Sequence, residues 1–130
     1  WAKNLGGLNA LIARADANAK VIYGFVAAND WIANLAVVDE TRSNTSVCLK
    51  IVDKDVAALD ADAQAAFAKG VVALLEKENV ALDIGAYRDA PSGLRIWAGA
   101  TIETADMAAL MPWLTYAFET QKAALNKAAA

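Results

Sequence analysis

The apolar positions of this chain recur at two different spacings, and the change of spacing marks where helices and strands are expected. Between residues 4 and 28 they recur every three or four positions, which is typical of one face of an amphipathic helix. The members of this stripe are Leu5, Leu8, Leu11, Ile12, Ala15, Ala19, Ile22 and Val26. We therefore expect a long first helix, weakened at its start by Gly6 and Gly7.

A second helical pattern follows Asp60. The carboxylate of Asp60 can accept orphan backbone N–H groups and so predicts the N-terminal cap. The pattern runs to about Glu78, and Asn79 is a suitable left-handed stop.

A third helical pattern begins at Thr104, which we predict as its cap, and its apolar face continues to Leu125. Pro112 lies inside this pattern. Because proline removes one helical hydrogen bond and clashes with the preceding turn, a kink or a break is predicted at residues 108–111.

Alternating apolar and polar positions predict strands at residues 46–51, 80–86 and 94–98. Between the last two, Pro91-Ser92-Gly93 supplies turn chemistry, so they are expected to pair as a hairpin. The segment 29–44 has no clean period but carries apolar anchors such as Trp31. It is predicted to be a packed connector that can include a short strand.

The order of elements is therefore helix, strand, helix, strand, strand, helix. It predicts an α+β fold: a two-layer sandwich in which a small, mostly antiparallel sheet of about three strands is covered on one face by helices. The opposite, open face would carry the polar side of the strands. Its expected members are Cys48, Lys50, Asp83, Tyr87, Arg95 and Trp97.

Two arginines flank the connector of the predicted hairpin. If the strands pair, Arg88 and Arg95 both lie near the loop end of the sheet, and Arg95 points away from the core. Planar guanidinium groups grip carboxylates or phosphates through paired hydrogen bonds, so this rim is a candidate site for a dianion. The alternative is that both are solvated or paired with a nearby acid, for which Asp83 and Asp89 are available.

Composition excludes several classes of function. The chain of 130 residues predicts one domain, and its net charge of −3 with scattered basic residues gives no nucleic-acid footprint. No apolar run approaches the ~20 residues that cross a bilayer. Histidine is absent, which removes the commonest general base and most zinc sites. We predict no metal ligands, no nucleic-acid or membrane partner, and, with Cys48 as the single cysteine, a cytoplasmic location.

Four segments resemble the C-terminal small domain of the phosphoserine aminotransferase family, class V enzymes that depend on pyridoxal phosphate. The segment 87–97 is the most specific of them and looks like the hairpin that reaches the active site. The others look like the start of the interdomain helix, the entry to the first small-domain strand and the lead into the final helix. In chain order the four are Trp1–Leu8, Thr41–Val47, Tyr87–Trp97 and Ala100–Glu103.

This resemblance implies a transaminase that moves the amino group of glutamate onto 3-phosphohydroxypyruvate, giving 2-oxoglutarate and phosphoserine in serine biosynthesis. Arg95 stands where the family holds the substrate α-carboxylate, and Arg88 where an arginine lies toward the substrate phosphate. Tyr87 replaces a histidine of some relatives. Trp97 shares a face with Arg95 and can shape the pocket, whereas Arg42 matches an arginine expected to be structural.

The resemblance also implies what lies elsewhere. The expected organisation is a single domain, 1–130, with an interdomain helix at 1–28 and the small domain at 29–130. A chain that opens on Trp1 looks like a piece of a longer two-domain enzyme that forms a homodimer. The cofactor and its Schiff-base lysine would belong to the large domain. We therefore expect no catalytic or cofactor-binding residue here, and no activity from this chain alone.

Three alternatives stay open. The chain can be the small domain of another class V enzyme, such as a serine–glyoxylate aminotransferase. A cysteine desulfurase would need a reactive cysteine on a flexible loop, whereas Cys48 is predicted to lie inside a strand. A regulatory amino-acid-binding module of the ferredoxin-like kind would begin and end with strands, whereas this pattern begins and ends with helices.

Overall fold

The secondary structure follows the predicted order, with one strand exchanged for another. The computed structural model describes residues 1–128. Its elements are α1 (Ala2–Leu5), α2 (Gly7–Ala27), β1 (Ile32–Asn34), the 3-10 helix η1 (Asp39–Thr41), β2 (Ser46–Ile51), α3 (Lys54–Ala57), α4 (Ala61–Lys77), β3 (Leu94–Trp97) and α5 (Thr104–Ala128). Within these residues, no helix combines the length and the apolar character needed to cross a membrane.

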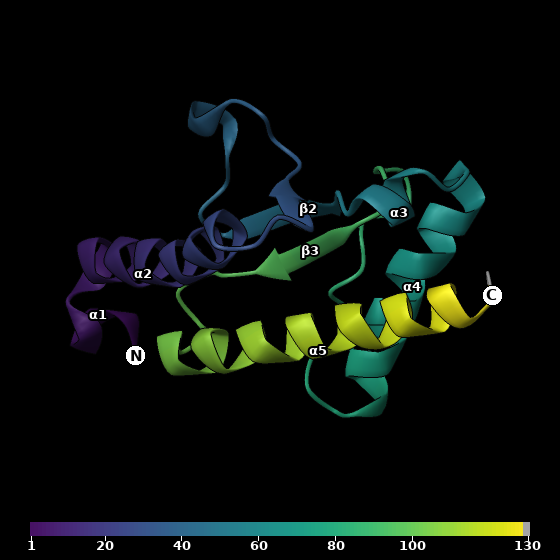
Figure 1. The fold of residues 1–130 in the computed structure, drawn as a ribbon. Coiled ribbons are helices and arrows are strands. Elements are labelled where there is room, and N and C mark those ends of the chain that lie inside the picture. Colours follow the sequence, from purple (N-terminus) through teal and green to yellow (C-terminus); the bar gives the residue numbers. More distant parts are fainter. Residues whose placement is uncertain (129–130) are drawn as a thin grey trace.

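The three strands form one antiparallel sheet in the order β1-β2-β3. The helix α5 runs along the length of the sheet, α2 and α4 flank it, and the loop between β1 and β2 projects away from α5 (Figure 1). The predicted α+β arrangement, with helices packed on a small antiparallel sheet, is therefore confirmed.

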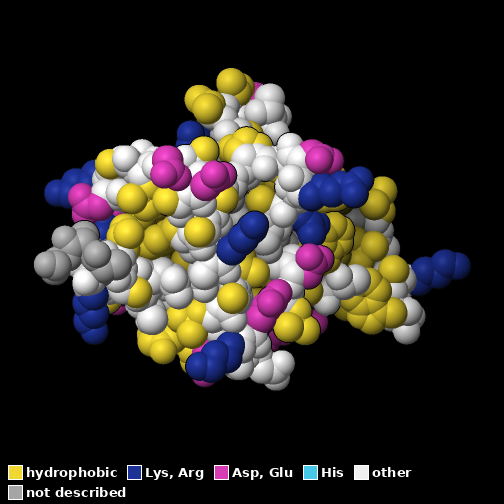
Figure 2. Space-filling view, turned by 90° about the vertical axis from the view of Figure 1, so that its right-hand side faces the viewer, with side chains coloured by type: hydrophobic (Ala, Val, Ile, Leu, Met, Phe, Trp, Pro, Cys, Tyr) yellow, Lys and Arg dark blue, Asp and Glu magenta, His cyan; other side chains and the backbone are white. Residues whose placement is uncertain are grey.

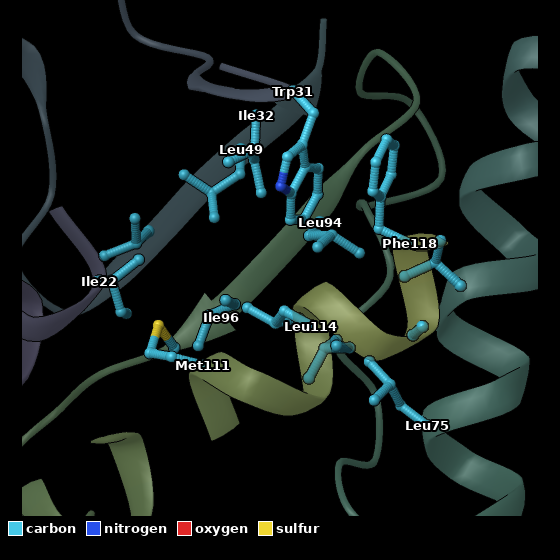
Figure 3. Close-up of a cluster of buried hydrophobic side chains, with 14 of the residues drawn as sticks. Ile22, Trp31, Ile32, Leu49, Leu75, Leu94, Ile96, Met111, Leu114 and Phe118 are labelled. Carbon is cyan, nitrogen blue, oxygen red and sulfur yellow. The ribbon is translucent and has the colours of Figure 1, made fainter. Parts of the chain in front are cut away.

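The core lies between the sheet and the helices. The side chains of Leu49, Leu94 and Ile96 point toward α5, whose Leu114 is fully buried beneath them (Figure 3). Trp31 stacks on Phe118 of α5, with ring centroids 4.1 Å apart. Full burial of one such apolar side chain stabilises the fold by about 1.5–3 kcal/mol, so this layer fixes which face of the sheet is covered.

The predicted strand at residues 80–86 is not a strand. Asp83 has a φ of 54°, a left-handed conformation that interrupts the alternation, and Leu82 consequently remains 70% exposed. Only one isolated bridge, between Gly85 and Leu94, pairs this segment with β3. The predicted hairpin is therefore reduced to this bridge, which is held by hydrogen bonds from the N–H of Arg95 to Ile84 and from the N–H of Ala86 to Gly93.

The third strand is β1, which lies in the connector between residues 29 and 44. Ile32 pairs with Ile51, so β1 occupies the edge of the sheet opposite β3. The possibility of a short strand in this packed connector is therefore realised.

The first two predicted helices are confirmed with small changes at their ends. Gly6, at φ 111°, separates α1 from α2, as expected from the glycine pair. Asp60 caps α4 by accepting a 2.8 Å hydrogen bond from the N–H of Ala63. After α4, Asn79 adopts the predicted left-handed conformation, with φ 55°.

For the last helix, the predicted cap is wrong, and the break that was one of the two outcomes predicted at residues 108–111 does not occur. Thr104 is already its first residue, and the Thr104 hydroxyl donates to the side chain of Asn18 instead of capping the helix. The helix also continues through Pro112 without a break. Because Met111 and Leu114 are buried on either side of the exposed proline, their packing holds the two halves in one helix.

A buried amide that the sequence analysis did not single out joins α2 to the segment between β3 and α5. Asn18 is fully buried, and its Nδ2 atom donates to the carbonyl oxygens of Ala98, Gly99 and Ile102 at 3.2, 3.2 and 2.9 Å. Arg14, one helical turn earlier, donates to the carbonyl oxygen of Ala100 at 2.9 Å and pairs with Glu103. These contacts fix how the chain leaves β3.

A charged cluster ties α5 to the start of α3. Lys122 donates to Asp53, which also caps α3, and lies 2.8 Å from a carboxylate oxygen of Asp55. Burial alone raises the pKa of Asp53, but hydrogen bonds from Lys122 and from the N–H groups of Val56 and Asp55 outweigh it and lower the pKa. Burial lowers the pKa of Lys122, and its bonds to the two carboxylates outweigh that and raise the pKa.

Replacing Lys122 with methionine is expected to lower the free energy of unfolding by about 1–2 kcal/mol near neutral pH, because a half-buried carboxylate loses its cation. The lowered pKa of Asp53 contributes stability above its ordinary value of 3.8, which is lost in acid. The raised pKa of Lys122 contributes stability below 10.5, which is lost in strong base.

Urea unfolding from pH 2 to pH 9 checks this expectation. The difference between wild type and Lys122→Met is expected to be constant above about pH 5 and to shrink below pH 4. Lys127→Met, on the exposed last turn of the same helix, is the matched control with little effect at any pH. A difference that persists unchanged at pH 2 would contradict the ionic origin.

Candidate functional site

The open face of the sheet carries the candidate binding residues. Cys48 of β2 lies opposite Arg95 of β3, and Ser46 lies opposite Trp97, so these four side chains share one face. The intervening residues of both strands are buried against the helices. The alternation of the sequence thus places Arg95 and Trp97 on the uncovered side, with 33% of the Arg95 side chain and 52% of Trp97 exposed.

Arg95 is only partly satisfied by the described residues. Its Nη2 atom lies 3.3 Å from a carboxylate oxygen of Asp83. Its Nε atom is buried and has no hydrogen-bond partner within residues 1–128. The buried Nε does not face solvent, but one third of the side chain is exposed. Because a guanidinium presents five N–H donors, its Nη groups keep hydrogen-bonding capacity for an anion on the open face.

Arg88 lies in the exposed segment that leads to β3. Its Nε atom is 3.4 Å from a carboxylate oxygen of Asp89, and its guanidinium carbon is 6.0 Å from the ring centroid of Tyr87. The Arg88 side chain is 82% exposed. Arg95 and Arg88 therefore contact Asp83 and Asp89, the two acids considered as their partners from the sequence. Ion pairs that are this exposed contribute little stability.

The two arginines line different hollows. Tyr87 and Arg88 line one of about 370 Å³ between α4 and the segment that precedes β3, together with Lys69 of α4. Arg95 and Trp97 line another of about 350 Å³ beside β3. Within the described residues, the arginines do not form the shared corner that the hairpin pattern predicted. The reason is that the path of residues 80–93 is a loop and not a strand.

Trp97 and Arg42 have contacts of different kinds. The indole N–H of Trp97 donates to the hydroxyl of Thr101 at 3.3 Å, which holds the ring beside Arg95 on the exposed face. Arg42 donates to the carbonyl oxygens of Ala36 and Val37 and pairs with Asp39, all in its own loop. These contacts are those of a structural arginine.

The described residues do not fit a complete cofactor site. None of their lysines is fully buried, and Lys122 is engaged by two carboxylates. A lysine that condenses with a carbonyl cofactor works from a desolvated pocket. Cys48 lies in the middle of β2, so it is not the loop nucleophile that a desulfurase requires.

The fold is similar to part of several solved structures. Two solved structures of a phosphoserine aminotransferase with radiation damage of its Schiff base each match 92% of this chain and 30% of their own, with a TM-score of 0.72 and 18% identity. A phosphoserine aminotransferase from Bacillus circulans subsp. alkalophilus matches 93% of this chain with a TM-score of 0.74 and 16% identity. This arrangement of helices and strands is therefore shared with part of these solved structures.

Two curated proteins are similar to this chain in sequence. The chain is 47% identical over 122 residues to the phosphoserine aminotransferases of Methanosarcina mazei and Methanosarcina barkeri. Nearly the whole of this chain is therefore homologous to part of these phosphoserine aminotransferases. The match covers 94% of this chain but only 30% of the length of each relative. No protein-family model matches the chain.

Proposed function

We propose that this chain is the C-terminal, substrate-positioning domain of a cytoplasmic phosphoserine aminotransferase. The complete enzyme would transfer the amino group of glutamate to 3-phosphohydroxypyruvate, as a homodimer. Pyridoxal phosphate would supply the amino-carrying chemistry from the part of the enzyme outside this chain. By itself, the chain would not catalyse the reaction.

The observation that carries this proposal is Arg95 on the open face of the sheet. Its guanidinium is anchored on one side by Asp83 and retains unpaired donors. A substrate α-carboxylate would accept two parallel hydrogen bonds from such a planar group and would be fixed in both position and orientation. Trp97, held by Thr101, would form one wall beside it.

Arg88 would serve the phosphate of the substrate. Its side chain is exposed and weakly held, so it can turn toward an anion that enters from outside the chain. Arg88 and Arg95 line separate hollows, which suits a substrate whose carboxylate and phosphate lie at opposite ends. The role of Tyr87, where some relatives have histidine, would be to support Arg88 through its ring.

The first helices support the proposed division at residue 28. Leu5, Leu8 and Ile12 are 40%, 72% and 47% exposed, although they belong to the apolar stripe of the sequence. Exposed apolar side chains at a helical spacing are typical of a surface that packs against another domain. Residues 1–28 would therefore be the interdomain helix and residues 29–130 the small domain.

A chimeric enzyme tests the proposal. The matched 122-residue segment of the Methanosarcina mazei enzyme is replaced by this chain, and amino transfer from glutamate to 3-phosphohydroxypyruvate is measured. We expect the chimera to be active and Arg95→Lys to lower kcat/KM roughly 10- to 100-fold, because lysine cannot donate two parallel bonds to one carboxylate.

Arg14→Lys is the matched control, since the Arg14 side chain is similarly exposed at 26% but bonds to the segment after β3. It is expected to alter the thermal midpoint more than kcat/KM. An active chimera in which Arg95→Lys and Arg14→Lys have equal kinetics would exclude the proposed role of Arg95. A folded chimera that binds the cofactor but transfers no amino group would exclude the proposed function.

A further inference from the structure

The loop between β1 and β2, residues 35–45, has an apolar tip. It projects from the rest of the molecule (Figure 1), and hydrophobic side chains are visible at the top of the projection (Figure 2). Val37 and Val38 are 78% and 55% exposed. Tips of surface loops are usually polar, so the exposure of two neighbouring valines is unusual and can indicate a contact surface.

The tip is braced from inside the loop. Arg42 donates from Nε to the carbonyl oxygen of Ala36 at 3.1 Å and from Nη2 to that of Val37 at 3.4 Å. Its Nη1 atom lies 2.6 Å from a carboxylate oxygen of Asp39. One inward-turned guanidinium thus satisfies both carbonyl groups at the base of the tip, and the valine side chains are left pointing outward.

The loop is also anchored to α2. The hydroxyl of Tyr23 donates to the carbonyl oxygen of Ser43 at 2.8 Å, and the amide of Asn44 donates to the carboxylate of Asp16 at 2.5 Å. Burial raises the pKa of Tyr23, although the charge of Arg42 lowers it in part, so the hydroxyl remains a donor. The loop is therefore pre-ordered, which reduces the entropy that a binding partner would have to offset.

We propose that Val37 and Val38 form a docking tip that inserts into the part of the same polypeptide outside this chain. This inference rests on the proposal that the chain is one domain of a longer enzyme. More than two thirds of the length of the relatives has no counterpart here, and in the proposed enzyme that further part would supply the surface that covers the tip. Two valines bury too little area to hold two free copies together, since stable interfaces need about 1,200–2,000 Å². A partner in the same polypeptide can dock with a much smaller buried area, because the covalent linkage raises its effective concentration at the tip.

Thiol labelling of the chimera described above tests the tip directly. Val38→Cys is compared with Lys77→Cys, an exposed position on α4, in a Cys48→Ala background. We expect Val38→Cys to react with iodoacetamide at least about tenfold more slowly in the chimera than in the isolated 130-residue chain. Lys77→Cys is expected to react equally fast in both. Equal rates for Val38→Cys would overturn the proposal, as would protection that disappears when the chimera is diluted to monomers.

A second variant separates docking from folding. Val38→Asp is expected to leave the thermal midpoint of the isolated chain within about 1 °C and to lower that of the chimera by roughly 3 °C or more. An equal shift in both proteins would overturn the proposal. Amino transfer is measured in parallel: an inactive chimera with a protected tip contradicts the proposed function alone, and an active chimera with an unprotected tip contradicts the docking alone.

Discussion

Asn18→Ala is expected to lower the free energy of unfolding by about 3 kcal/mol. The change removes one buried amide that donates to three backbone carbonyl groups and accepts from the Thr104 hydroxyl. Each buried polar group left without a partner costs about 1–3 kcal/mol, reduced here because Ile102 and Thr104 can recover water. Urea unfolding followed by tryptophan fluorescence measures the loss.

Asn44→Ala is the matched control, because Asn44 is exposed and makes one side-chain bond, to Asp16. Its expected effect is below about 0.5 kcal/mol. Asn18→Asp sharpens the test, since a carboxylate of the same shape cannot donate and would face three carbonyl oxygens. We expect it to be at least as destabilising as alanine at pH 7 and milder in acid, where the carboxyl group can donate. Equal stability of Asn18→Ala and Asn44→Ala would contradict the stabilising role of the Asn18 hydrogen bonds.

The position of Asn18 shows what the sequence could have revealed. It lies three residues after Ala15 and four before Ile22, on the inner side of the first helical stripe. A polar residue there must find a buried partner or leave the core. That partner is about 80 residues away in the chain, so its identity depends on tertiary packing, which periodicity does not encode.

The three long helices and two of the strands were predictable because a regular period leaves a repeated signal in the sequence. The structure of segment 80–86 was not predictable, since its extended backbone is interrupted at a single residue. Asp83 adopts a left-handed conformation, which aspartate tolerates better than most residues. An aspartate is equally compatible with the solvent-facing side of a strand, so the residue type does not reveal the conformation. This segment therefore keeps only one bridge to β3, and the third strand of the sheet is β1 at the opposite edge.

The same contrast holds for the candidate site. The face of Arg95 followed from alternation, because β3 is regular and its neighbours Leu94 and Ile96 are buried. The separation of Arg88 from Arg95 did not, since it depends on the path of a loop. Side chains on regular elements can thus be oriented from sequence, whereas distances across irregular segments need coordinates.

Gly93→Ala is expected to destabilise the fold by about 4 kcal/mol. A Cβ atom built on Gly93 would lie 2.1 Å from the carbonyl oxygen of Leu49 and 3.2 Å from its carbonyl carbon. Both are backbone atoms of β2, which is paired on both sides and cannot move without breaking the sheet. The steric cost is therefore met by separating β3 from β2, which is among the few mechanisms that reach several kcal/mol.

Gly24→Ala on α2 is the matched control, because its added Cβ atom would meet nothing within 4 Å. Alanine favours a helix over glycine by roughly 0.5–1 kcal/mol, so this variant is expected to be slightly more stable than wild type. The two substitutions add the same methyl group and are expected to shift the thermal midpoint in opposite directions. A Gly93→Ala midpoint within about 2 °C of wild type would mean that β2 and β3 can part at this point without cost. The position of Arg95, two residues after Gly93 in the chain, would then have to be fixed by contacts other than the pairing of β3 with β2.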